Sequence, residues 1–141
     1  LAAELCKRSG MTQAFFCNSG TESIEAAIKI ARRWGFNKGI TAPVIIVTEG
    51  AFHGRTLGAL TATHSAKYQE GFGPLPGGFV RVPYNDVEAM AAAIKANAGT
   101  VAVMVEPAQG EGGVHIPKAD YLNRLRELCD KNDVLLILDE V

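Results

Sequence analysis

Apolar residues occur along this chain in two distinct patterns. Short, continuous aliphatic runs, such as residues 44–47 and 134–138, are typical of strands that are buried on both faces of a sheet. The longer segments between them carry apolar residues at helical spacing, which is typical of amphipathic helices. Strands that alternate with helices in this way predict an α/β fold with a mostly parallel sheet flanked by helices.

The predicted elements follow one another from the first residues to the last. We expect strands at residues 13–17, 44–47, 80–82, 101–105 and 134–138. We expect helices at residues 2–8, 22–34, about 56–64 and about 119–131, and a further helix that Asn85 and Glu88 open as a capping box. Because the chain starts inside a helical pattern and stops just after a strand, we also expect it to be a piece of a longer protein.

The start of the helix at residues 22–34 is the first candidate site. Ser19 and Glu22 form a capping box, and Gly20 has no side chain to keep an anion away from the backbone N–H groups of the helix start. Thr21 adds a hydroxyl donor. These residues fit a phosphate site, while an ordinary capped helix would explain the same pattern taken alone.

Other polar residues follow the predicted strands, at the sheet edge where ligands gather in parallel sheets. Asp139 is either a solvated residue or a carboxylate aimed at a protonated ring nitrogen. Glu106 and Glu111 flank a Gly-rich turn, and they either face one cleft or lie on a surface turn. Phe52 and Arg55 also allow two interpretations. In the first, Phe52 is a core residue and Arg55 is a surface charge. In the second, Phe52 is a flat aromatic side chain beside the Arg55 guanidinium, which binds a carboxylate in two places.

Composition narrows the function classes. The chain has 141 residues, of which 48% are hydrophobic and 21% charged, and its net charge of −1 without a basic run argues against nucleic acid as a partner. No apolar run approaches the length of a membrane span. We find no metal-ligand pattern, and we interpret His53 and His64 as structural. The cysteines share no metal or redox spacing and are interpreted as small, reduced core residues of a cytoplasmic protein: Cys6, Cys17 and Cys129.

Four stretches in register resemble the class III aminotransferases, which are pyridoxal-phosphate enzymes of the fold-type I architecture. These stretches are Ser19-Gly20-Thr21-Glu22, Phe52-His53-Gly54-Arg55-Thr56, Glu106-Pro107-Ala108-Gln109-Gly110-Glu111 and Leu138-Asp139-Glu140-Val141. The resemblance implies that residues 1–141 form part of the large, cofactor-binding domain of a fold-type I transferase. Within the class, the chain resembles most the acetylornithine branch, which is close to the ornithine branch, and residues 68–75 and 82–86 favour the former. This implies N-acetylornithine or an ornithine-like donor, 2-oxoglutarate as the acceptor, and a place in arginine biosynthesis.

The resemblance also implies how the cofactor is held. Gly20 and Thr21 match the backbone that binds the phosphate of pyridoxal 5'-phosphate. Phe52 matches the aromatic residue that stacks on the pyridine ring, and Asp139 matches the partner of the ring nitrogen. The protein would supply orientation and electrostatics, while the cofactor would be the electron sink.

The substrate side is implied in the same way. Arg55 matches the residue that binds the substrate α-carboxylate, Glu111 matches the acid that engages a second arginine, and Glu106 belongs to the same acidic network. The implied partners are amino acid and 2-oxo acid substrates, and the implied full-length form is a homodimer that binds neither nucleic acid nor a membrane.

One part of the family pattern has no match here. The Schiff-base lysine, the second arginine and the small domain lie beyond the position that corresponds to Val141. None of the lysines present fits the catalytic role: Lys7, Lys29, Lys38, Lys67, Lys95, Lys118 and Lys131. We therefore expect no catalytic residue within this chain, and no transamination by the chain alone.

Two alternatives stay open. Another class III aminotransferase, acting on 4-aminobutyrate or succinyl-diaminopimelate, would carry the same stretches. A non-catalytic phosphate-binding α/β module would need only the helix start. It would leave five candidate residues unexplained: Phe52, Arg55, Glu106, Glu111 and Asp139.

Overall fold

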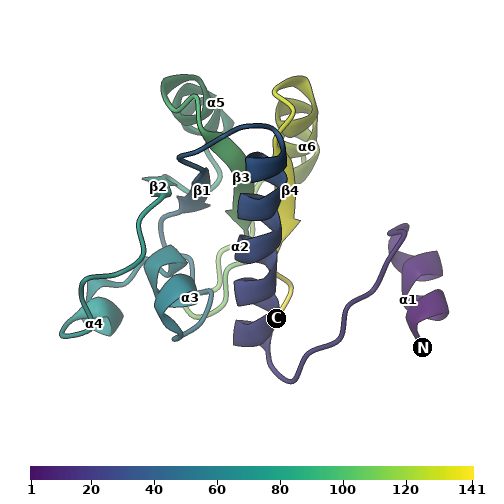
Figure 1. The fold of residues 1–141 in the computed structure, drawn as a ribbon, viewed down its shortest axis with the longest axis horizontal. Helices are drawn as coiled ribbons and strands as arrows, with labels where there is room; N and C mark the ends of the chain where they lie inside the picture. Colours follow the sequence, from purple (N-terminus) through teal and green to yellow (C-terminus); the bar gives the residue numbers. More distant parts are fainter.

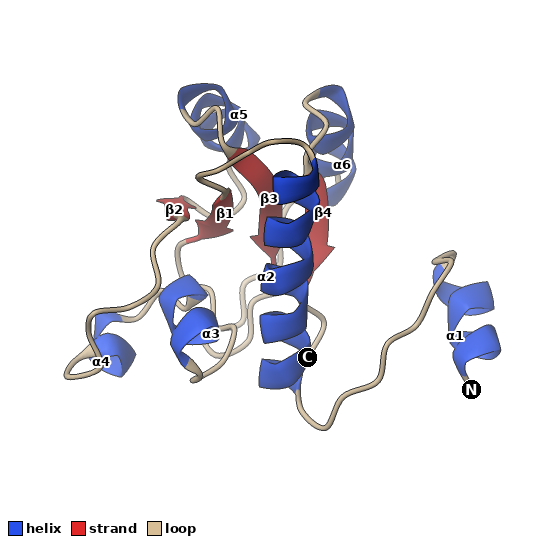
Figure 2. Ribbon diagram, viewed as in Figure 1, coloured by secondary structure: helices blue, strands red, loops and turns tan.

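A computed structural model describes residues 1–141 and contains a four-stranded parallel sheet with the strand order β2-β1-β3-β4 (Figures 1 and 2). The strands are β1 (Val44–Thr48), β2 (Phe79–Val82), β3 (Thr100–Val105) and β4 (Leu135–Leu138). The helices are α1 (Ala2–Ser9), α2 (Gly20–Asn37), α3 (Leu57–Ala62), α4 (Ala66–Gln69), α5 (Val87–Ala96) and α6 (Tyr121–Lys131). The parallel α/β architecture predicted from the hydrophobic pattern is confirmed.

Helices cover both faces of the sheet. On one face, α2 and α3 pack against alternate residues of the two central strands, among them Ile45, Val47 and Met104. On the other face, α5 and α6 pack against the intervening residues, among them Ile46 and Val103. Because both faces are covered, every residue of β3 is buried, which explains why this strand reads as a continuous aliphatic run.

The parallel arrangement brings the carboxyl ends of the strands to one edge. The segment after β1 contains Phe52 and Arg55, Glu106 follows β3 directly, and Asp139 follows β4 directly. The start of α2 reaches the same edge, because Gly20 lies against Val141. Segments far apart in the sequence therefore meet where parallel sheets bind their ligands.

The strand predicted at residues 13–17 is wrong. These residues form no strand in the structure, and they belong to an extended arm that links α1 to the start of α2 (Figure 1). Phe15 and Phe16 keep 73% and 54% of their surface exposed, and α1 buries no residue. An apolar run becomes a strand only where another strand pairs with it, and none lies beside this arm.

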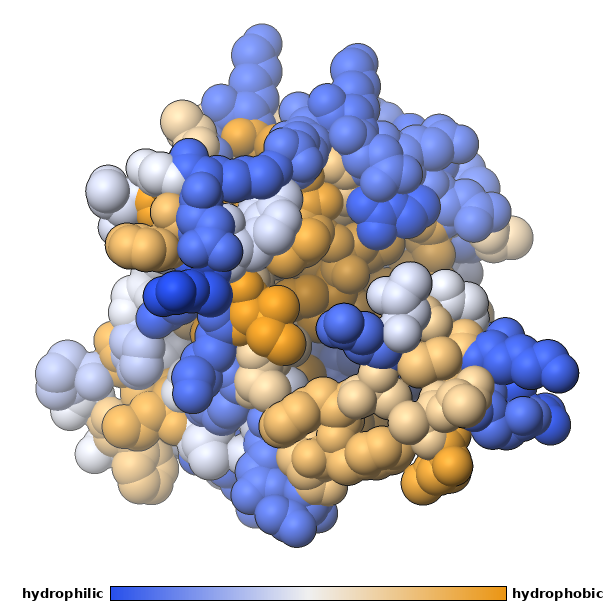
Figure 3. All heavy atoms as spheres, turned by 45° about the vertical axis from the view of Figure 1, so that its right-hand side comes forward, coloured by the Kyte–Doolittle hydropathy of each residue, from blue (hydrophilic) through white to orange (hydrophobic).

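Exposed apolar side chains are not confined to the arm. Leu57 and Phe72, near α3 and α4, are also more than half exposed. Figure 3 shows such apolar atoms at the surface beside strongly polar regions, on a face that is hollowed between them.

Two predicted helix starts differ in detail. Ser19 Oγ accepts from the Glu22 N–H at 3.3 Å, as the capping box requires, but the Glu22 carboxylate accepts from Asn18 N–H at 2.6 Å rather than from Ser19. The predicted box of Asn85 and Glu88 is wrong, because Asp86 is the N-cap and accepts from the Ala89 N–H at 2.9 Å. Asn85 instead adopts a left-handed conformation, with φ 63°, before the helix.

The cysteines were expected in the core, and only Cys129 is buried there. Burial raises the pKa of the Cys129 thiol to about 11, whereas Cys17 is exposed on the arm and Cys6 is half-buried. No group of three or more His, Cys, Asp or Glu side chains could hold a metal ion. None of the helices is both long enough and apolar enough to cross a membrane.

Candidate functional site

The start of α2 forms one wall of a pocket of about 280 Å³ at the carboxyl edge of the sheet. Ser19 is the N-cap, so the N–H groups of Gly20 and Thr21, two residues that line this pocket, have no partners inside the helix. The pocket is lined by Ser19, Gly20, Thr21, Ile24, Phe52, His53, Gly54, Asp139 and Val141. Three of the four predicted stretches therefore meet at one pocket.

Two glycines allow this close approach. A Cβ at Gly20 would lie 2.5 Å from Val141 Cγ1, and a Cβ at Gly54 would lie 2.0 Å from Thr21 Oγ1. Gly54 also has φ 127°, a backbone conformation that residues with a side chain rarely adopt. The Thr21 hydroxyl oxygen in turn accepts from the Arg55 N–H at 3.4 Å. The helix start and the turn after β1 are thus held against each other.

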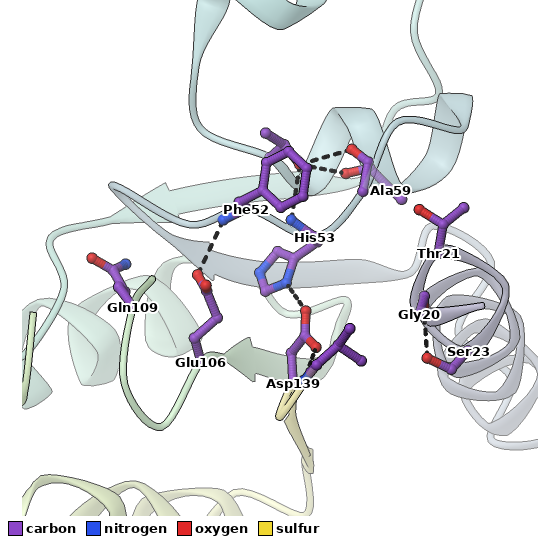
Figure 4. Close-up of polar contacts among 12 residues, drawn as sticks. Gly20, Thr21, Ser23, Phe52, His53, Ala59, Glu106, Gln109 and Asp139 are labelled. Atoms are coloured by element: carbon purple, nitrogen blue, oxygen red, sulfur yellow. Dashed lines mark hydrogen bonds and ion pairs between the residues drawn. The ribbon is translucent and has the colours of Figure 1, made fainter. Parts of the chain in front are cut away.

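Asp139 is buried at the floor of the pocket and contacts His53 (Figure 4). His53 Nδ1 lies 2.7 Å from Asp139 Oδ2, and the two side chains are 0% and 5% exposed. An ionised carboxylate only accepts hydrogen bonds, so Nδ1 is the donor in this contact. Asp139 Oδ1 accepts from the Val141 N–H at 3.2 Å. Each carboxylate oxygen has a second lone pair, so Asp139 retains accepting capacity toward the pocket.

Glu106 holds the turn that carries Phe52. Its carboxylate accepts from the Phe52 N–H at 3.0 Å, and the residue is buried (Figure 4). Burial raises the pKa of the Glu106 carboxyl above its ordinary value, and the nearby Asp139 charge adds to this, while the Phe52 N–H and His53 oppose it. Glu106 therefore supports the backbone beneath the aromatic ring.

Arg55 is exposed next to two aromatic rings. Its guanidinium carbon lies 5.9 Å from the centre of the Phe52 ring and 5.7 Å from that of Tyr68. The Phe52 and Tyr68 rings meet edge to face, with their centres 5.8 Å apart. None of the ion pairs in the structure includes Arg55. The guanidinium is thus positioned by rings while its charge stays unpaired.

Glu111 contacts Tyr68, whose hydroxyl donates to Glu111 Oε1 at 3.1 Å. Together with Phe52 and His64, these residues line a second pocket of about 250 Å³. Glu106 does not line this pocket. The expectation that Glu106 and Glu111 both face one cleft is therefore wrong, because Glu106 turns inward to the Phe52 backbone.

Three residues at this edge were not found from the sequence as members of the site. His53 contacts Asp139 through Nδ1, but its Nε2 is buried without a hydrogen-bond partner. Only one of its two ring nitrogens therefore has the partner that a structural histidine would have. Tyr68 joins Arg55 to Glu111. Gln109 is buried and donates to the Glu49 carbonyl at 2.7 Å, which ties the loop after β3 to the end of β1. His53 and Gln109 follow strand ends that meet, which is their only sequence signal, whereas Tyr68 lies in the helix α4 and no strand end marks it.

The comparison with known protein families decides the membership of this chain. The sequence profile of the family described as aminotransferase class III matches residues 1–141. The chain belongs to the class III aminotransferases. It is 56% identical, over 141 residues, to the acetylornithine aminotransferase of Nitrosomonas europaea, and this match covers 100% of the chain and 36% of that protein. This class III chain therefore spans about a third of the length of the curated relatives it matches.

Solved structures of class III aminotransferases share the fold. An ornithine aminotransferase from Toxoplasma gondii, described with partial occupancy of pyridoxal phosphate at its active site, superposes with a TM-score of 0.92 at 36% identity. That match covers 97% of this chain and 33% of the other. The N-acetylornithine aminotransferase of Stenotrophomonas maltophilia gives a TM-score of 0.77 at 39% identity, covering 97% of this chain and 32% of the other. These neighbours agree with the predicted fold-type I class.

Proposed function

We propose that this chain is part of the large domain of a pyridoxal-phosphate-dependent aminotransferase that uses N-acetylornithine, or an ornithine-like donor, and 2-oxoglutarate. The observation that supports it most is the convergence of the α2 start, the Phe52 ring and the Asp139 carboxylate on one pocket. The acetylornithine donor is supported by the Nitrosomonas relative, and arginine biosynthesis is the pathway in which that reaction would serve.

The residues of the pocket fit this cofactor. The partner-free N–H groups at Gly20 and Thr21 suit a phosphate, because a helix start carries both the donors and the positive end of the helix dipole. Phe52 lines the same pocket and supplies a flat face for the ring. Asp139 would hold a proton on the ring nitrogen, and it lies in a largely dry site where a charge-assisted contact is strong. When bound, the ring supplies the electron sink for the bond broken at the substrate α-carbon.

The residues around Tyr68 suit the substrate. Arg55 would bind the α-carboxylate of donor and acceptor in two places, since no carboxylate of the chain occupies it. Glu111, held by the Tyr68 hydroxyl, would engage the second arginine of the family. Glu106 would act through Phe52, whose backbone it binds, rather than by touching the substrate.

Further parts of the proposal concern the whole protein. None of the lysines lines the pocket beside Asp139, so the lysine that binds the cofactor covalently would come from a segment that follows this chain. We further propose a homodimer, as in the family, and a cytoplasmic location that suits the free cysteines. Donors such as 4-aminobutyrate or succinyl-diaminopimelate stay alternatives for the same pocket.

The test is amino transfer by the full-length protein loaded with pyridoxal phosphate. N-acetylornithine, ornithine, 4-aminobutyrate and succinyl-diaminopimelate are each offered with 2-oxoglutarate, and glutamate formation is measured. We expect N-acetylornithine to give the highest kcat/KM. Cofactor absorbance without any amino transfer would reject the enzyme assignment, and phosphate binding without cofactor binding would favour the non-catalytic module.

A further inference from the structure

The carboxylate of Glu25, on α2, caps the start of a different helix, α3. Glu25 Oε1 accepts from the N–H groups of Gly58 and Ala59 at 3.0 Å and 3.1 Å, and it also accepts from the Thr56 hydroxyl. These N–H groups lie in the first turn of α3, where the helix itself offers no acceptors. Thr56 is the N-cap residue, but its side chain makes no cap hydrogen bond. The start of α3 is therefore satisfied by a side chain of α2.

Two side chains of α2 hold the backbone on either side of Arg55. Thr21 and Glu25 are four residues apart, so they share one face of the helix. Thr21 Oγ1 accepts from the Arg55 N–H, and Glu25 binds the residues that follow. Each contact faces a glycine: a Cβ at Gly54 would collide with Thr21, and a Cβ at Gly58 would lie 2.6 Å from Glu25 Oε2. The segment around Arg55 is thus packed directly on the helix whose start is the proposed phosphate site.

The turn before Arg55 is tied to the end of α3. Thr63 Oγ1 accepts from the His53 N–H at 2.9 Å and lies 3.1 Å from the Gly54 carbonyl oxygen. The anchor of α3 at Glu25 therefore sets the place of this turn as well. Phe52 is held separately, because its N–H donates to Glu106 from the end of β3. Loss of Glu25 should accordingly displace Arg55 more than Phe52.

We propose that Glu25 is a positioning residue for the substrate carboxylate, because it fixes the backbone of Arg55 relative to the phosphate site at the start of α2. The Arg55 guanidinium is exposed and has no carboxylate partner, so its place depends on its backbone and on the rings beside it. A two-pronged contact with a carboxylate needs a fixed fork, and a displacement of about 1 Å weakens it. This role rests on the proposed function, which assigns Arg55 to carboxylate binding.

The test uses the full-length enzyme with Glu25→Ala, which removes the acceptor, and Glu25→Gln, which keeps an amide oxygen. The first readouts are KM and kcat with the donor that the wild type uses best, and the affinity for pyridoxal phosphate. The Kd of glutarate, a dicarboxylate without the oxo group, is measured by calorimetry. Amide hydrogen exchange at Gly58 and Ala59 reports the cap itself. Glu88→Ala is the matched control, because Glu88 is a glutamate of α5 that pairs with the exposed Arg124.

We expect Glu25→Ala to raise KM for both substrates, and the glutarate Kd, about fivefold or more, with kcat and cofactor affinity within about twofold of the wild type. Exchange at Gly58 and Ala59 should become faster. Glu25→Gln should restore most of the loss, because all three hydrogen bonds end on one oxygen. In an Arg55→Lys background, where the fork is already absent, Glu25→Ala should change KM by less than about twofold.

A second variant disturbs the same contact from the other side, and it also provides the answer if Glu25→Ala does not fold. Gly58→Ala places a Cβ about where the Glu25 carboxylate lies, while alanine itself suits a helix better than glycine. We expect KM to rise in this variant too. The two substitutions together should raise KM no further than Glu25→Ala alone, because both remove one contact.

Three results would overturn the role. The first is faster exchange at Gly58 and Ala59 with unchanged KM and glutarate Kd. The second is a loss of cofactor affinity as large as the loss for glutarate, as a merely structural residue would give. The third is an undiminished effect in the Arg55→Lys background. All three leave the proposed function intact if the wild type transfers amino groups, whereas a wild type that transfers none would reject that function, and this role with it.

Discussion

The carboxyl edge of the sheet holds two regions that are built in opposite ways. Around Asp139 the side chains are buried and paired, with His53 completely enclosed and each Asp139 oxygen hydrogen-bonded. Around Arg55 the charges are exposed, and aromatic rings rather than carboxylates position them. Buried, fixed groups act on charge that develops during a reaction, whereas exposed, unpaired groups bind and release a charged ligand. Under the proposed function, the first region would serve the chemical step and the second would serve substrate binding.

The largest expected effect comes from Asp139→Asn in the buried region. Asparagine keeps the shape, but its single amide oxygen can replace only one of the two carboxylate oxygens that accept from His53 and the Val141 N–H, and it cannot hold a proton on the ring nitrogen by charge. We expect the single-turnover rate of α-proton removal to fall by about 10² or more. Asp133→Asn, at an exposed acid that pairs with Lys38, is the control. Equal rates in the Asp139 variant and the wild type would show that the buried carboxylate has no part in the chemical step.

The exposed region is tested by Arg55→Lys, which keeps the charge and loses the two-pronged fork. We expect KM to rise about tenfold for both the donor and the acceptor, with a smaller change in kcat. Arg33→Lys is the control, because Arg33 also lies beside an aromatic ring, that of Phe36, away from the site. A variant with normal KM for both substrates would remove Arg55 from carboxylate binding.

A smaller effect is expected from Gly20→Val at the start of α2. A valine at Gly20 would collide with Val141, two residues after Asp139, and would crowd the N–H groups of the first turn. We expect the affinity of the full-length protein for pyridoxal phosphate to fall roughly fivefold or more. Gly77→Val is the control, since no atom lies within 4 Å of a Cβ at that position. Unchanged affinity, measured by titration of the absorbance, would exclude this turn as the phosphate site.

The smallest effect is a pH dependence of stability from Glu106. Its folded-state pKa is raised by burial, so the folded protein binds this proton more tightly than the unfolded chain does. The stabilisation is fully present below the unfolded pKa and is lost as pH rises through the folded pKa. We measure the free energy of unfolding in urea for the wild type and for Glu106→Gln. The difference, wild type minus variant, should therefore be larger at pH 4 than at pH 7. A stability difference that is constant with pH would mean that Glu106 titrates normally.

The elements of the fold that local hydrophobic patterns determine could be predicted from the sequence. The buried strand β3 and the amphipathic α2 follow from aliphatic runs and helical spacing. Residues 13–17 show the limit, because their apolar run has no strand to pair with. The start of α5 shows another, since Asn85 and Asp86 are both good caps and only their backbone conformations separate them.

The candidate site was predictable only in part, for a similar reason. Asp139 was identified by its position after a strand, but its partner His53 lies 86 residues away in the sequence. Tyr68 and Glu111 are 43 residues apart, and nothing in the local sequence of either indicates the other. Residues recognised by their type and neighbours were found, while residues defined by contacts across the sheet edge needed the structure.

The most direct test of the division between the two regions is the protonation state of the ring nitrogen of bound pyridoxal phosphate. The nitrogen-15 chemical shift of labelled cofactor is measured by NMR in the full-length wild type, in Asp139→Asn and in Arg55→Lys. We expect a protonated ring nitrogen at neutral pH in the wild type and in Arg55→Lys, and an unprotonated one in Asp139→Asn. The same protonated shift in all three proteins would contradict the role of the buried carboxylate, and with it the separation of the chemical step from substrate binding.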